Sequence, residues 1–220
     1  MSETRETTAG GFFPRLGSVL ALAPLGLWVC WHLWENLYAV VGEAAWQERV
    51  TDRQHPVAEG LTLLVVFGPL VLHTLWGLRR VAMARPNGYR YFGNARYVLQ
   101  RLSALGVLLF LVAHVYLARI HPALTEDHPE RFGDLAAEMR MPKTLVVYLL
   151  GVLGTAYHLA NGVQTAAFIH GFTASSRAAR RMQWASVVFF LLLLGTGWGA
   201  VYGLWRAGAE YEAPQVSLLR

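Results

Sequence analysis

The chain has 220 residues, of which 55% are hydrophobic and only 15% are charged, with a formal net charge of +5. This composition is too apolar for an ordinary soluble domain and predicts a single all-α membrane domain over residues 1–220. The basic residues form no basic helix or aromatic RNA-binding pattern, so nucleic acid is not an expected partner. The one cysteine, Cys30, excludes an internal disulfide, a cysteine-bound iron–sulfur cluster and a C-x-x-C-H haem attachment.

Five apolar segments are long enough to cross a bilayer as helices, which takes about 20 residues. In chain order, the predicted spans cover about 16–41, 60–78, 99–120, 144–169 and 183–204. The first 15 residues lack the apolar core and cleavage site of a signal peptide, so we expect this end to be retained. Between the third and fourth spans, RFGDLAAEMR predicts a short surface helix outside the membrane.

The loops between the spans differ in charge. The connection from Arg79 to Arg101 contains six arginines and no acid, and the 170–182 connection contains three more arginines, whereas the other two loops mix both signs. Basic loops of membrane proteins stay on the cytoplasmic side. The sequence therefore predicts a multi-pass protein of the cell's inner (cytoplasmic) membrane, with the N-terminus inside and the C-terminus outside.

Four of the eight histidines lie within the first four spans, each about two-thirds of the way along: His32, His73, His114 and His158. The other four lie in loops or at span ends, where contact with water accounts for them: His55, His121, His128 and His170. Because successive helices run in opposite directions, His32 and His114 are expected near the outer side, and His73 and His158 near the inner side. Two imidazoles at equal depth can supply both axial ligands of a six-coordinate haem iron. The pattern predicts two haem b groups bound by coordination alone.

A single intramembrane histidine has more than one common role, and it is as often a packing or relay residue as a ligand. The matched pairs, and the scarcity of other charges within the spans, favour haem over a histidine-lined proton channel or transporter. Glu35, three residues after His32, is the exception to this scarcity of charged residues within the spans. A carboxylate that reaches the outer interface would account for Glu35 equally well.

A haem also needs room beside the backbone and donors for its propionates. Gly151, Gly154 and Ala156 precede His158 and would leave room for the ring, although small residues also serve plain helix contacts. Candidates for propionate contacts lie near the inner ends of the spans: Ser18, Arg101 and Ser103.

The segments WHLWEN, VLHTLWGL, YVLQRLSALG, FLVAHVYLAR and YHLANG resemble the cytochrome b558 subunit of succinate dehydrogenase, a five-helix dihaem anchor also found in dihaem fumarate reductases. The resemblance covers nearly the whole chain, and LQR before the third span and H-x-x-N-G in the fourth are its most specific pieces. It implies His73 with His158 on the haem nearer the cytoplasm and His32 with His114 on the distal haem, as depth also predicts. In dihaem fumarate reductases of this family, a glutamate proposed as a proton carrier lies two residues before the fourth-span ligand. Here that position is Ala156.

The resemblance implies two partners, a flavoprotein that oxidises succinate and an iron–sulfur protein on the cytoplasmic side. We expect the chain to anchor them in the membrane lipid and to pass electrons through both haems to a quinone, menaquinone, near the outer face. It carries no catalytic residue for succinate chemistry itself. Glu35 and Asn36 are candidates for the quinone region, with Glu59 as the alternative carboxylate. Fumarate reduction, a proton channel and a purely structural anchor are the alternatives.

Overall fold

The structure is a computed structural model of the chain, and it describes residues 12–52, 60–83, 92–125 and 130–217. Every regular element within these residues is a helix, and five helices are long and apolar enough to cross a membrane. They cover Arg15–Val40, Gly60–Ala82, Ala95–Ile120, Pro142–Ile169 and Ser176–Tyr211. The predicted all-helical fold with five spans is therefore confirmed.

The first three spans are assembled from shorter helical pieces. The first contains α1 (Phe12–Leu20), the π-helical η1 (Ala21–Gly26), α2 (Leu27–Asn36) and the 3-10 segment η2 (Leu37–Val40). The second contains the π-helical η3 (Leu63–Phe67) and α5 (Gly68–Ala82). The third contains most of α6 (Phe92–Val115) and η4 (Tyr116–Ile120), and the short α7 (His121–Thr125) follows it. The wide turn of η1 contains Pro24, which has no N–H to donate to a regular helix.

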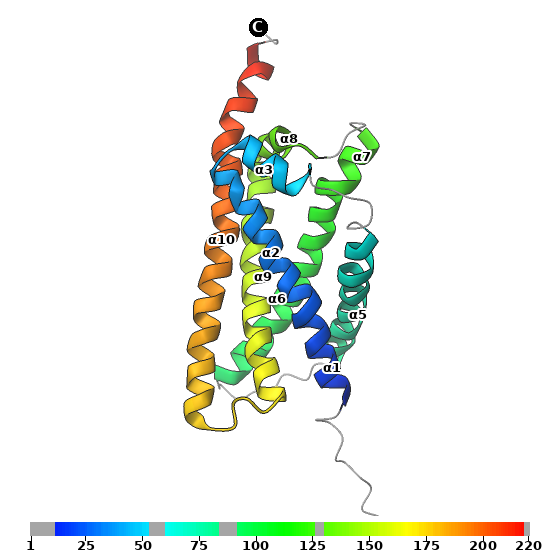
Figure 1. Cartoon of the computed structure of the whole chain (residues 1–220), viewed down its shortest axis with the longest axis vertical. Helices are drawn as coiled ribbons and strands as arrows, with labels where there is room; N and C mark the ends of the chain where they lie inside the picture. Colours follow the sequence, from blue (N-terminus) through cyan, green and yellow to red (C-terminus); the bar gives the residue numbers. More distant parts are fainter. Residues whose placement is uncertain (1–11, 53–59, 84–91, 126–129, 218–220) are drawn as a thin grey trace, which may run out of the picture.

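The last two spans are single helices, α9 (Pro142–Ile169) and α10 (Ser176–Ser217). The helix α9 packs against α6 on one side and α10 on the other, and α10 also contacts α2, η2 and α8. At 42 residues, α10 is about 63 Å long and extends beyond the predicted 183–204 span at both ends. Figure 1 shows its C-terminal part rising past the other helices. The apolar run in the sequence predicted only the part of this helix that is apolar enough to cross the hydrocarbon core.

Three exposed tryptophans lie on α10: Trp198, which is 40% exposed, and two others that lie on either side of it along the helix. Trp184 is 68% exposed and Trp205 is 36% exposed. They are 21 residues apart in the sequence (205 − 184), which is about 32 Å along a helix and close to the hydrocarbon thickness of about 30 Å. Tryptophan is enriched at both membrane interfaces. We therefore expect the residues of α10 after Trp205 to lie beyond the hydrocarbon core.

A glycine repeat brings α10 close to the first span. Gly195, Gly199 and Gly203 recur every four residues, and a Cβ added to Gly203 would lie 2.6 Å from the carbonyl carbon of Ala39 in η2. Small residues at this spacing let two backbones approach within a membrane. The repeat is visible in the sequence, but its partner helix is decided by the fold.

One end of the bundle is closed by a compact cap. The cap consists of α3 (Glu43–Val50), α8 (Phe132–Met139) and the C-terminal part of α10 (Figure 1). We call this end of the bundle the cap end. The largest fully buried side chains among the described residues belong to it: Trp46, Phe132 and Met139. The Trp46 and Phe132 rings lie 5.6 Å apart, and Tyr211 Oη donates to Glu43 Oε2 at 2.7 Å.

The helix α8 corrects one expectation. It forms at the predicted place, but one of its faces belongs to the hydrophobic core, with Leu135, Ala136 and Met139 buried. Its apolar residues recur at helical spacing and are covered by α3, α9 and α10. The prediction of a helix lying on the surface was therefore wrong for this face.

Exposed arginines gather at the opposite end, which we call the arginine end. Arg79 and Arg80 lie at the end of α5, and Arg177, Arg180 and Arg181 lie at the start of α10. The beginning of α1 and the connection between α9 and α10 lie at this end as well (Figure 1). Arg85 and Arg90 lie outside the described residues.

Candidate functional site

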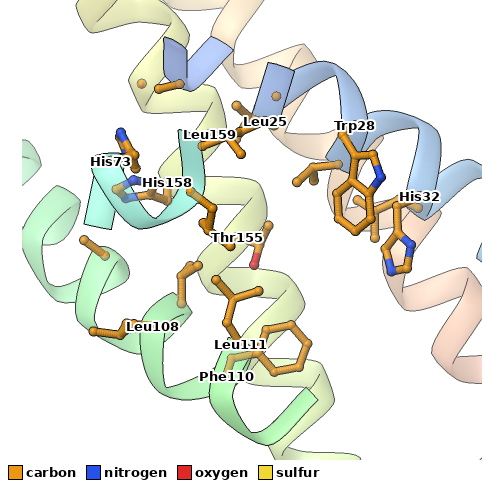
Figure 2. A pocket seen from close by; sticks show the side chains of 18 of the residues that line it. Leu25, Trp28, His32, His73, Leu108, Phe110, Leu111, Thr155, His158 and Leu159 are labelled. Atoms are coloured by element: carbon orange, nitrogen blue, oxygen red, sulfur yellow. The ribbon is translucent and has the colours of Figure 1, made fainter. Parts of the chain in front are cut away.

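A cavity of about 2000 Å³ lies between the helices, and the four intramembrane histidines all line it. Most of its lining is apolar. Small-molecule sites in proteins usually have volumes of about 300–1,000 Å³, so this cavity has room for two ligands of that size. Figure 2 shows His73 and His158 close together and His32 well apart from them.

The histidine pair nearer the cap consists of His32 on α2 and His114 on α6. Their ring centroids are 5.8 Å apart and their planes are inclined by 70°. Trp28 stacks on His32 at 4.7 Å, and Phe110 stacks on His114 at 5.4 Å. The Nδ1 atom of His114 lies 3.2 Å from Tyr148 Oη on α9. Asn36 Nδ2 lies 3.5 Å from His32 Nε2. Aromatic contacts and these two polar contacts therefore orient the imidazoles.

The pair nearer the arginine end consists of His73 on α5 and His158 on α9, with centroids 6.1 Å apart and planes inclined by 73°. The Nδ1 atom of His158 lies 3.2 Å from Gln100 Nε2 and 3.3 Å from Ser103 Oγ, both on α6. Asn161 donates from Nδ2 to Gln100 Oε1 at 2.7 Å. The LQR and H-x-x-N-G segments therefore meet through a direct side-chain bond.

The two pairs lie at different depths. Tyr148, which reaches the cap-end pair, and His158, which belongs to the other pair, are ten residues apart on α9. At about 1.5 Å per residue, this spacing separates the pairs by about 15 Å along the helix. On α6, Ser103 and His114 show nearly the same spacing.

The separations within the pairs fit a shared metal ion. With a metal–imidazole bond of about 2.0 Å, two imidazoles on opposite sides of one ion have ring centres roughly 6 Å apart. Edge-to-face rings without a metal also lie about 4.5–7 Å apart, so the spacing permits ligation without requiring it. In His114 and His158 the Nδ1 atom has a polar neighbour, which leaves Nε2 as the ligand atom.

The donor set fits haem better than a bare metal ion. Among the described residues, no three or more histidine, cysteine, aspartate or glutamate side chains come together as a metal site. An ion between two imidazoles would need further ligands, and a porphyrin supplies four nitrogens in one plane. The large apolar cavity around both pairs is of the kind such a ring requires.

The three residues predicted to contact the propionates differ in their hydrogen bonds and neighbours. Arg101 lines the cavity with its guanidinium 3.3 Å from the centre of the Tyr97 ring, and its buried Nε has no hydrogen-bond partner among the described residues. Ser18 donates to Arg15 O and lies 2.9 Å from His170 Nε2. Ser103 lies beside the His158 ring.

The small residues before His158 serve helix packing. The Phe110 side chain occupies the space that a Cβ at Gly151 would need, and a Cβ at Gly154 would touch Val107 at 3.7 Å. Both glycines therefore face α6, and the prediction that they leave room for a haem ring was wrong. Ala156 is fully buried.

The predicted quinone residues line the cavity near the cap. Asn36 donates from Nδ2 to His32 O at 2.9 Å and accepts from Trp46 Nε1 at 3.2 Å, so it joins the ligand helix to the cap. Glu35 is half-buried. Three residues considered from the sequence lie outside the described residues: Glu59, His55 and His128.

These features define a five-helix membrane protein with two stacked histidine pairs, and comparison with known proteins gives its family. Residues 86–196, about half of the chain, match the family described as Succinate dehydrogenase/Fumarate reductase transmembrane subunit. The chain is 29% identical over 194 residues to the succinate dehydrogenase cytochrome b558 subunit of Bacillus subtilis (strain 168), covering 87% of this chain and 95% of that protein. The chain belongs to the succinate dehydrogenase/fumarate reductase transmembrane subunit family.

Proposed function

We propose that this chain is the dihaem cytochrome b subunit that anchors a succinate dehydrogenase in the membrane and links its iron–sulfur subunit to a quinone. The observation that carries the proposal is the meeting of four histidines from four spans as two pairs, about 15 Å apart in depth, in one cavity. The name of the Bacillus relative, a cytochrome b558, supports haem as the ligand of these pairs.

Each pair would hold one haem b, with His73 and His158 at the arginine end and His32 and His114 at the cap end. Bound haem would supply an iron that gains and loses single electrons. The chain's own part would be to supply two imidazoles to each haem, to hold those imidazoles by stacking and hydrogen bonds, and to surround the site with apolar side chains. Arg101 is the proposed donor to the propionates, whereas the hydroxyl protons of Ser18 and Ser103 are directed at backbone oxygens.

The charge distribution supports an orientation in the membrane. The exposed arginines at the arginine end favour the cytoplasmic side. They support the proposal that the N-terminus lies inside and the cap and C-terminus outside. The flavoprotein and iron–sulfur subunits would then dock at the arginine end. The Bacillus relative supports the cytoplasmic membrane of a bacterium as the location.

The quinone, which we propose to be menaquinone, would be reduced near the cap-end pair. Glu35 and Asn36 follow His32 directly in the next helical turn and line the same cavity. Quinone reduction takes up protons, so a carboxylate near the electron exit suits this place.

A spectrum with haem quantitation tests the proposal. The purified full chain should show a reduced-minus-oxidised spectrum of b-type haem, with two haems per chain, and acid–acetone should extract both because Cys30 cannot provide a c-type linkage. Absence of haem, or haem that stays with the polypeptide, would refute it. In the whole complex, succinate should reduce the haem rapidly, whereas a purely structural anchor would show no such reduction.

The membrane potential tests the proposed electron direction. When an electron crosses fully from the cytoplasmic to the positive outer side, the membrane potential lowers its free energy by about 2.3 kcal/mol per 100 mV. In tight, correctly oriented vesicles, an uncoupler should therefore slow menaquinone reduction by succinate and leave reduction of an artificial acceptor at the flavoprotein unchanged. An unchanged or faster quinone-linked rate would contradict an exit at the cap end.

A further inference from the structure

We infer that Ser103 and Gln100 are positioning residues for His158: Gln100 holds the ligand in place, whereas Ser103 favours the tautomer that binds haem iron and lowers the midpoint potential of that haem. This inference rests on the proposed function. Both residues belong to α6, whereas the ligand belongs to α9, so the site depends on contact between two helices.

The hydrogen bonds of Ser103 have a defined polarity. Its hydroxyl donates to the backbone oxygen of Gln100 at 3.1 Å. The Ser103 Oγ atom also lies 3.3 Å from His158 Nδ1. Because the hydroxyl proton is directed at the carbonyl, the Oγ lone pairs are available to accept a proton from the imidazole. An imidazole that binds iron through Nε2 carries its proton on Nδ1 and needs such an acceptor.

Gln100 fixes the position of the ligand in another way. Its Oε1 accepts from Asn161 Nδ2 at 2.7 Å, which turns its amide nitrogen toward His158. That nitrogen donates to the backbone oxygen of His158 at 3.2 Å. It also lies 3.2 Å from His158 Nδ1, where it can only donate. Gln100 therefore suits an imidazole without a proton on Nδ1, and Ser103 suits the tautomer that binds iron.

The acceptor at Nδ1 affects the iron through the imidazole. A hydrogen bond from Nδ1–H to an acceptor makes the ligand more basic, which stabilises oxidised iron and lowers the potential. The cap-end ligand His114 has a phenol oxygen, Tyr148 Oη, at the corresponding place. The two sites therefore differ in the partner of the ligand, and each can be changed without touching the other.

Redox titration of the full chain in detergent, with haem quantitation, tests the inference. Ser103→Ala should shift the midpoint potential of the arginine-end haem to more positive values, while Ser103→Thr, which keeps the hydroxyl, should stay close to the unaltered protein. Gln100→Leu should weaken retention of the same haem by about tenfold. The spectrum lost in His158→Ala identifies which haem has shifted.

Two control variants separate this effect from general damage. Ser186→Ala removes a buried serine hydroxyl that donates to Ala160 O at 2.8 Å on the same helix α9, and it should shift neither potential. Tyr148→Phe should change the cap-end haem alone. If two haems remain bound, the inference would be overturned by an unchanged midpoint potential of the arginine-end haem in Ser103→Ala, or by an equal shift of that potential in Ser186→Ala. A chain without haem would instead refute the proposed function.

Discussion

The two ends of the bundle are packed in different ways. At the cap end, Trp46, Phe132 and Met139 are fully buried, and bonds such as Tyr211 to Glu43 join separate helices. At the arginine end, α5 carries His73 but has no buried residue, and many of its apolar side chains are exposed. The cap end therefore has a core of large buried side chains, which α5 at the other end does not have.

The difference has a physical reason. The cap lies beside the part of α10 that follows Trp205. We expect this part to lie beyond the hydrocarbon core, where water drives apolar side chains together. Between lipid tails there is no such drive, and helices associate through close packing and polar contacts instead. Side chains that face lipid are exposed in the structure without being in water. We therefore expect the cap to stabilise the bundle and the arginine end to depend on its ligand and partners.

Loss of one ligand should have the largest effect and should separate the two ends. His158→Ala should remove the arginine-end haem and weaken assembly with the iron–sulfur subunit, since that pair lies toward the proposed docking side. His114→Ala should remove the cap-end haem and leave more of the assembly intact. Haem quantitation and difference spectra measure both effects. Removal of the same haem by His73→Ala and His114→Ala, with the other lost in His158→Ala, would contradict the pairing.

Truncation in the cap should have the next largest effect. Trp46 is 0% exposed and donates to Asn36 Oδ1, so Trp46→Ala should lower the free energy of unfolding by about 3–5 kcal/mol. Denaturation of the full chain in detergent measures the change. Trp184→Ala is the control, because Trp184 is 68% exposed and packs little in the bundle. Equal loss of stability in both variants would contradict the role given to the cap.

A smaller effect is expected where α10 meets η2. Gly203→Ala would place a methyl group 2.6 Å from the backbone of Ala39 and should destabilise the bundle by about 1–3 kcal/mol. Gly195→Ala belongs to the same repeat, but a Cβ there meets nothing within 4 Å and should be nearly neutral. Thermal unfolding of the two variants side by side measures the difference. Similar melting temperatures would show that the close contact is relaxed at little cost.

The mildest change concerns the quinone region. Glu35→Gln keeps the size of the side chain and should slow quinone reduction by about tenfold, a barrier increase of about 1.4 kcal/mol, while haem content stays unchanged. Quinone-linked turnover of the complex, compared with an artificial acceptor, measures it. Turnover equal to that of the unaltered complex would return Glu35 to the role of a carboxylate at the membrane interface.

The candidate site shows how far depth alone can predict contacts. The alternation of helix direction predicts that His32 and His114 share one depth and His73 and His158 another, and in the structure the rings of each pair lie next to each other. Their role as haem ligands stays a prediction. The contact of Ser103 with His158 was not predicted, because depth says nothing about which face of a helix meets its neighbour.

The sequence by itself determined the number of spans, their order and the depth of each histidine, because a bilayer requires about 20 apolar residues per helix and fixes their alternation. Tertiary structure decided the rest. The length of α10, the burial of α8 in the cap, and the packing of Gly151 against Phe110 depend on how helices are rotated and which helices adjoin. Those choices arise from shape complementarity between side chains distant in the sequence, which no single apolar segment encodes.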